Sequence, residues 1–93
     1  MKTYALEQIQ SELKLAFKWM ARATCYAKQG EFCSASRCMT IAQQHWNECQ
    51  HERDKYIDDD EAEKIHWDFI TMKAADMAKK ELEKELKDEQ ENA

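Results

Sequence analysis

The chain has no proline and a single glycine, Gly30, among its 93 residues. β-Sandwiches, barrels and phosphate-binding loops need residues that adopt positive φ or fix it, so this composition excludes architectures that are dense in turns. No apolar run approaches the roughly 20 residues that cross a bilayer. With 43% apolar and 35% charged residues, the sequence predicts one small helical domain over residues 1–93.

An excess of positive charge is also missing. The formal net charge is −5, whereas a general nucleic-acid binder carries a basic excess that displaces counterions from phosphate. The first residues lack the continuous apolar segment of a secretion signal. We therefore expect a cytoplasmic protein that binds neither nucleic acid directly nor a membrane. Its four cysteines are expected to be reduced, and the sequence leaves open whether they are free thiols or bind metal: Cys25, Cys33, Cys38 and Cys49.

Apolar residues at spacings of three and four predict three helices, at about residues 4–29, 31–57 and 60–88. The expected inward stripe of the first helix is Leu6, Ile9, Leu13, Ala16, Met20, Ala23 and Ala27. That of the second is Phe32, Ala35, Met39, Ala42, Trp46, Cys49, Arg53 and Tyr56. The third begins with Ala62, Ile65, Phe69 and Met72. Gly30 lies where a left-handed residue would end the first helix, so we expect an all-α, antiparallel three-helix bundle.

The segment from Trp19 to Ala42 resembles a tetratricopeptide repeat. The residues in register with that motif are Trp19, Ala23, Tyr26, Gly30, Phe32, Ala35, Met39 and Ala42. The resemblance implies a tight helical hairpin, with the third helix in the place of the helix that caps such a repeat. It also implies a module that binds peptides or helices and is not an enzyme. The chain departs from the motif in lacking the usual leucine-glycine pair, the closing proline and a second copy.

A basic row and a second apolar row lie beside each other on the first helix. Lys14, Lys18 and Arg22 follow one another at four-residue spacing, which indicates either a solvated face partly neutralised by the acidic third helix or a docking strip for an acidic partner. Leu15, Trp19 and Tyr26 form the apolar row. We expect these six residues to bind another protein. If the apolar row is exposed, a two-fold homodimer would also bury it.

The predicted function is that of a small non-enzymatic protein-binding adaptor or inhibitor without a cofactor. An alternative is a phage or mobile-element protein that blocks a host defence machine, as anti-CRISPR proteins do. In that class, acidic residues would imitate nucleic-acid phosphates and occupy a basic groove. The carboxylates available for this are those of the C-terminal helix and of the acidic run Asp58, Asp59, Asp60 and Glu61.

A third alternative is a metal-binding helical protein. Glu48 with His51 and Glu63 with His66 have the Glu-x-x-His spacing of di-iron bundles. The apolar stripes place Trp46, Cys49, Ile65 and Phe69 inside, so these ligands could meet only at a dimer interface. Cys38, His45 and Cys49 share one face of the second helix, which is another arrangement that zinc or a cysteine nucleophile activated by His45 would use. Because core filling is the usual role of cysteine, we assign no metal-binding or catalytic residue.

Overall fold

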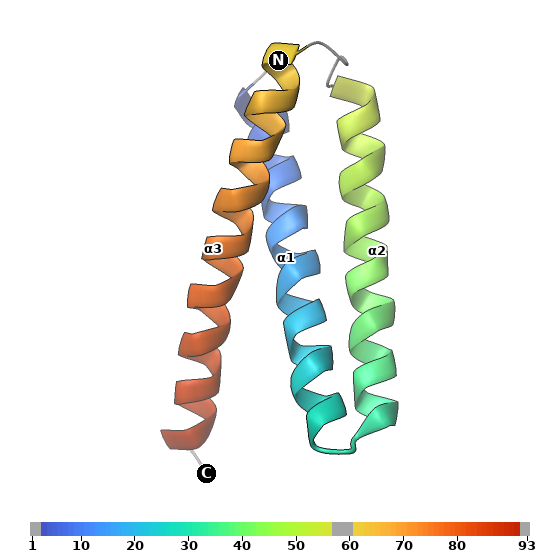
Figure 1. Ribbon diagram of the computed structural model, residues 1–93, viewed down its shortest axis with the longest axis vertical. Helices are drawn as coiled ribbons and strands as arrows, with labels where there is room; N and C mark the ends of the chain where they lie inside the picture. Colours follow the sequence, from blue (N-terminus) through green and yellow to red (C-terminus); the bar gives the residue numbers. More distant parts are fainter. Residues whose placement is uncertain (1–2, 57–60, 92–93) are drawn as a thin grey trace.

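The protein folds as a bundle of three helices. The computed structural model describes residues 3–56 and 61–91, and describes side chains within residues 7–55 and 67–91. Helix α1 covers Thr3–Lys28, α2 Phe32–Tyr56 and α3 Glu61–Glu91. Figure 1 shows α1 between the other two, with consecutive helices running in opposite directions. The all-α three-helix bundle expected from the sequence is therefore confirmed.

The central helix makes both of the main helix contacts. Within the described residues, α1 packs against α2 and against α3, whereas α2 and α3 have no close backbone approach to each other. Figure 1 shows these two outer helices leaning apart toward the end of the molecule that holds the α1–α2 turn. The principal extents of 46 × 24 × 19 Å reflect the elongated shape of this bundle.

Gly30 closes α1 in the predicted left-handed conformation, with a φ of 78°. The amide of Glu31 donates to the carbonyl of Tyr26 at 2.9 Å, and the amide of Gly30 donates to the carbonyl of Ala27 at 3.1 Å. This pair of bonds defines a Schellman motif, which satisfies the last carbonyls of a helix. Because only Gln29, Gly30 and Glu31 lie between the two helices, α1 and α2 pack as a tight antiparallel hairpin.

The core is built from small and medium side chains along α1. Ile9, Leu13, Ala16 and Ala23 are buried, as the sequence predicts for this helix. The outer helices contribute Ala35, Cys38, Ala42 and Cys49 from α2, and Ile70, Ala74, Ala78 and Leu82 from α3. At its centre Ile9, Leu13, Cys49 and Ala74 form one cluster, against which Phe17 and Trp67 pack. The many alanines allow the helix backbones to approach closely.

The predicted inward stripes of α2 and α3 are wrong in part. Phe32, Met39 and Trp46 are 70%, 48% and 38% exposed, and Phe69 and Met72 are 60% and 73% exposed. Each outer helix packs mainly against α1, so only a narrow stripe of it is covered. On α2 the covered stripe is that of Ala35, Ala42 and Cys49, and on α3 it follows four-residue steps from Ile70 to Leu82. Ile65 and Ala62 lie outside the described side chains.

Candidate functional site

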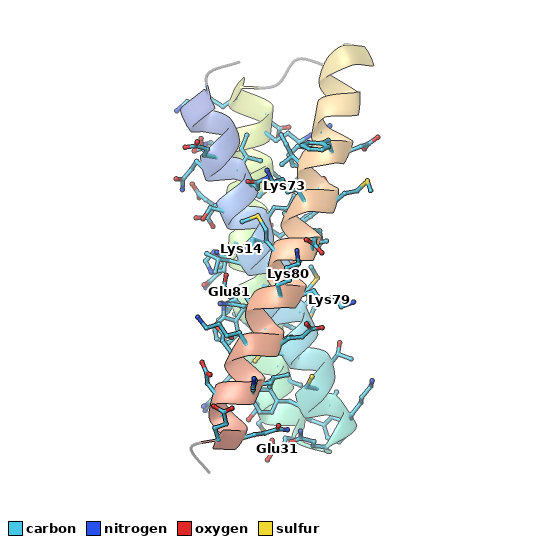
Figure 2. All side chains as sticks on the ribbon, turned by 90° about the vertical axis from the view of Figure 1, so that its left-hand side faces the viewer. Lys14, Glu31, Lys73, Lys79, Lys80 and Glu81 are labelled. Carbon is cyan, nitrogen blue, oxygen red and sulfur yellow. The ribbon has the colours of Figure 1, made fainter. Side chains whose placement is uncertain are left out.

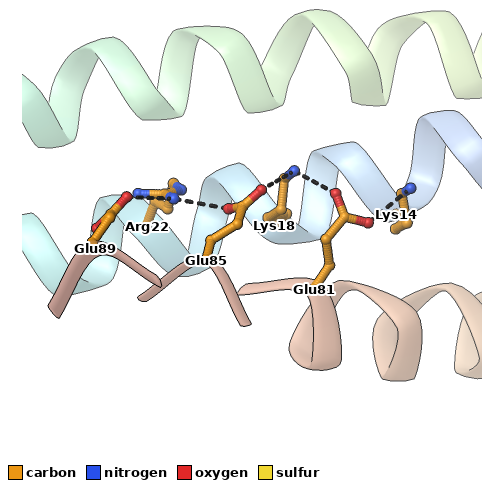
Figure 3. Close-up of polar contacts among 6 residues, drawn as sticks. All are labelled: Lys14, Lys18, Arg22, Glu81, Glu85 and Glu89. Atoms are coloured by element: carbon orange, nitrogen blue, oxygen red, sulfur yellow. Dashed lines mark hydrogen bonds and ion pairs between the residues drawn. The ribbon is translucent and has the colours of Figure 1, made fainter. Parts of the chain in front are cut away.

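The predicted basic row of α1 faces α3 and is paired with it. Three cations of α1 alternate with three carboxylates of α3, which we call the charge ladder (Figure 3). Lys14 Nζ lies 2.9 Å from Glu81, Lys18 Nζ lies 2.7 Å from Glu81 and 3.0 Å from Glu85, and Arg22 Nη2 lies 2.8 Å from Glu85 and 3.1 Å from Glu89. In Figure 2, Lys14 and Glu81 lie on the side of α3 next to α1.

Lys18 is the most enclosed member of the charge ladder, with 8% of the residue exposed. Burial opposes its charged form, but the hydrogen bonds that it donates to Glu81 and Glu85 outweigh this effect and raise its pKa above the ordinary 10.5. Hydrogen bonds from Lys18 and Lys14 lower the pKa of Glu81 below 4.5, and a hydrogen bond from Arg22 lowers that of Glu85. The basic row is thus neutralised within the chain by the third helix.

The charge ladder should make folding stability depend on pH. The lowered pKa values of Glu81 and Glu85 give a stabilisation that is present above about pH 4.5 and is lost as the pH falls below it. The raised pKa of Lys18 gives a stabilisation that is complete below 10.5 and is lost as the pH rises past its folded value. Urea titrations from pH 3 to pH 11 at low salt should therefore give a free energy of unfolding that is constant at intermediate pH and falls at both the acid and the alkaline end. In the double variant Glu81→Gln with Glu85→Gln, the free energy of unfolding should fall less at acid pH. An unchanged fall would contradict the assignment of this pH dependence to Glu81 and Glu85.

The second row of α1 is also largely covered. Leu15, Trp19 and Tyr26 are half-buried, and the guanidinium carbon of Arg22 lies 6.0 Å from the centroid of the Trp19 ring. Tyr26 and Arg22 border a small hollow of about 160 Å³ between α1 and α3. Each of the six residues predicted to bind a partner is therefore buried or half-buried, and the structure brings three of them together with α3.

The predicted imitation of nucleic-acid phosphates by the acidic run stays a prediction. Asp58, Asp59 and Asp60 lie outside the described residues, and so does the side chain of Glu61, with which α3 begins. The carboxylates of the C-terminal helix are the second group of residues predicted to imitate nucleic-acid phosphates. Three of them, Glu81, Glu85 and Glu89, face α1 and are paired in the charge ladder.

The predicted metal and thiol residues are dispersed. Cys38 and Cys49 are buried, Cys25 is half-buried and Cys33 is exposed. Burial and the nearby charge of Glu12 raise the pKa of the Cys49 thiol to about 11, which disfavours the thiolate that a nucleophile requires. The ring atom Nδ1 of His45 lies 2.7 Å from a carboxylate oxygen of Glu12.

Of the two Glu-x-x-His pairs, only one lies among the described side chains. Glu48 and His51 are exposed on α2, in agreement with the outward direction that the apolar stripes predict for them. The side chains of Glu63 and His66 are not among those described. In the part of the chain that the structure describes, no three His, Cys, Asp or Glu residues gather in a group that could hold a metal ion.

An apolar surface that the sequence analysis did not identify lies on α2. Phe32, Met39 and Trp46 follow one another at seven-residue spacing on one flank of the helix and are exposed. We call these three residues the α2 apolar strip. Beside Met39 and Trp46 is a hollow of about 300 Å³, lined by Phe17 and Met20 of α1 and by Met39, Ala42, Gln43 and Trp46 of α2.

The flank that carries the strip is free of formal charge from Phe32 to Gln50. Over this segment the only Asp, Glu, Lys or Arg residues are Arg37 and Glu48. At about 100° per residue, both lie roughly 160–180° around the helix from Met39. Gln43, which borders the hollow, donates a hydrogen bond to Asn47 at 2.9 Å. This depletion of charge is a signal that the sequence carries, in a chain in which 35% of all residues are charged.

Comparisons of the chain with protein families, with curated proteins and with solved structures gave no match. The resemblance of residues Trp19 to Ala42 to a tetratricopeptide repeat therefore stays a prediction. Among the described residues, no helix combines the length and the apolar character that crossing a membrane requires.

Proposed function

We propose that this chain is a small non-enzymatic protein-binding module and that its docking surface is the α2 apolar strip with the adjoining hollow. The observation that carries the proposal is the alignment of Phe32, Met39 and Trp46, all exposed, along a flank without formal charge. Such a surface is typical of the centre of a protein–protein interface, where aromatic residues and methionine are enriched and Lys and Glu are depleted.

The size of the surface supports the same function. Phe32 and Trp46 are 14 positions apart, which corresponds to about 21 Å along a helix at 1.5 Å per residue. A stripe of anchors of this length matches the way in which a helix is recognised along one face. Because large apolar side chains gain about 25 cal/mol for each Å² removed from water, covering three of them favours association.

The proposal moves the docking surface from α1 to α2. The six residues of α1 that the sequence predicted for binding are buried or half-buried, and the cations among them are paired with α3. A partner that used them would first have to separate α3 from α1. The α2 apolar strip requires no such rearrangement, because its side chains are already accessible.

A site-specific crosslinking experiment tests this function. A benzophenone amino acid replaces Met39 in the strip or, as the control, Met72, which is 73% exposed on α3. After irradiation in cells that express the chain, we expect covalent protein adducts from position 39 and few from position 72. The proposal fails if position 39 gives no adduct, or if the two positions give equal amounts.

A further inference from the structure

We infer that the occupant of the α2 apolar strip is a second copy of this chain, in a two-fold symmetric dimer whose axis passes beside Met39. This inference rests on the proposed function, because it names the partner of the same surface. It is carried by the spacing of the strip, by the area that the chain leaves exposed and by the charges around the strip.

The spacing of the strip makes it complementary to itself. Met39 stands seven residues from Phe32 and seven residues from Trp46. When two such helices pack antiparallel about an axis at Met39, each Phe32 lies opposite the partner's Trp46, and the two Met39 side chains meet at the axis. All three exposed side chains are then covered in both copies. A symmetric contact of this kind is the commonest form of homo-oligomer.

The exposed area agrees with what a stable dimer buries. The chain exposes 6642 Å², whereas a compact monomer of its mass, 11.1 kDa, exposes roughly 5,700 Å². The excess is about 940 Å² per chain, so two chains that cover it bury about 1,900 Å² in total. Stable and specific interfaces bury about 1,200–2,000 Å² in total. The excess is thus of the size that one such dimer contact would remove.

The charges of the chain permit this contact at the strip. Two copies with a net charge of −5 each repel one another, so an interface between them should lie where formal charge is low. The strip meets this condition, because Arg37 and Glu48 lie on the opposite flank of α2. A partner must also offer an uncharged apolar stripe about 21 Å long, and the strip of a second copy has this length.

The other exposed apolar pair serves as a control. Phe69 and Met72 are exposed on α3, but they are only two residues, and Asp68 and Lys73 beside them are charged and exposed. If the dimer forms through α2, changes at Met72 should leave it intact.

Sedimentation equilibrium of the purified full chain over a range of concentrations tests the inference. We expect a wild-type mass of twice 11.1 kDa at high concentration. Met39→Lys places two like charges at the axis and should raise the dimer dissociation constant at least about 100-fold, whereas Met72→Lys should leave it unchanged. Circular dichroism should record equal helix content for all three proteins, because both positions are exposed in the monomer.

A thiol crosslink tests the position of the axis. In a chain with Cys33→Ser, which removes the exposed native thiol, Met39→Cys should form a disulfide-linked dimer with oxidised glutathione. Met72→Cys should remain monomeric on a non-reducing gel. Loss of the dimer in Met72→Lys, or preferential crosslinking through residue 72, would overturn the inference.

The inference and the proposed function can fail separately. A monomeric chain whose photo-adduct at position 39 contains a different protein would overturn the dimer and would retain the protein-binding function. A monomeric chain with no adduct at position 39 would overturn both. An adduct of twice the chain mass, together with a Met39→Lys monomer, would support both.

Discussion

Replacing Leu13 with alanine is expected to lower the free energy of unfolding by about 3 kcal/mol, within the 2–5 kcal/mol that buried leucines cost on truncation. Leu13 is fully buried, with 0% exposure, and belongs to the cluster that joins Ile9, Cys49 and Ala74. Because this cluster contains residues of all three helices, the cavity would weaken both contacts of α1 at once. Urea denaturation followed by circular dichroism measures the loss.

The matched control for Leu13 is Leu86→Ala on α3. Leu86 is 36% exposed, so removing its side chain creates little cavity and should cost less than about 1 kcal/mol. If the two variants lose equal stability, Leu13 does not lie at the centre of a core shared by the three helices.

The second large effect is expected for Lys18→Ala. This change removes the cation that lies between Glu81 and Glu85 and leaves two carboxylates facing α1 without it. A hydrogen bond to a charged group contributes about 1.5–3 kcal/mol when it is buried. Because the side chains of the two carboxylates are 36% and 34% exposed, solvent screening reduces this value, and we expect a loss of about 2 kcal/mol in the free energy of unfolding.

Lys80→Ala is the control for Lys18. The Lys80 side chain is 74% exposed and pairs with Asp76 one turn away at 2.9 Å. Exposed pairs of this kind contribute about 0.3–0.5 kcal/mol. Raising the salt concentration to 1 M should abolish the small effect of Lys80 and only reduce that of Lys18, because enclosed pairs are screened less. Equal losses in the two variants would show that the charge ladder does not hold α3.

The sequence alone predicts α1 and its end well. Gly30 is the only glycine in the chain, and a glycine between two apolar stripes has few roles other than ending the first helix in a left-handed conformation. In the predicted inward stripe of α1, Ile9, Leu13, Ala16 and Ala23 are buried, since this helix has a neighbour on each side. Met20 is half-buried, Ala27 at the end of the helix is exposed, and the side chain of Leu6 is not among those described. The middle of this stripe is therefore covered whichever way the outer helices turn.

The outer helices were harder to predict because their exposure depends on which neighbours they lack. Phe32, Met39 and Trp46 are exposed because no described helix covers that flank of α2, and local spacing contains no information on which flank is covered. On α3, the long aromatic and methionine residues near its start suggested an inward face at Phe69, whereas the buried face follows Ile70 and the alanines.

The candidate site was predictable only in part. Four-residue spacing in Lys14, Lys18 and Arg22 matches the spacing of Glu81, Glu85 and Glu89, so the two rows of the charge ladder are visible in the sequence. Their pairing also requires α1 and α3 to lie side by side in the same direction, which the order of helices implies. The α2 apolar strip is visible as a stretch of low charge, but its accessibility required the structure.

The regular spacing of the charge ladder has a consequence for how α3 is aligned along α1. Sliding α3 by one helical turn, about 5.4 Å, would again place two cations opposite carboxylates and would leave one unmatched. The repeating charges thus hold α3 against α1 but discriminate poorly between neighbouring alignments. We expect the correct one to be selected at the other end of the helix, where the Arg53 guanidinium carbon lies 4.9 Å from the centroid of the Trp67 ring and Ile70 enters the core.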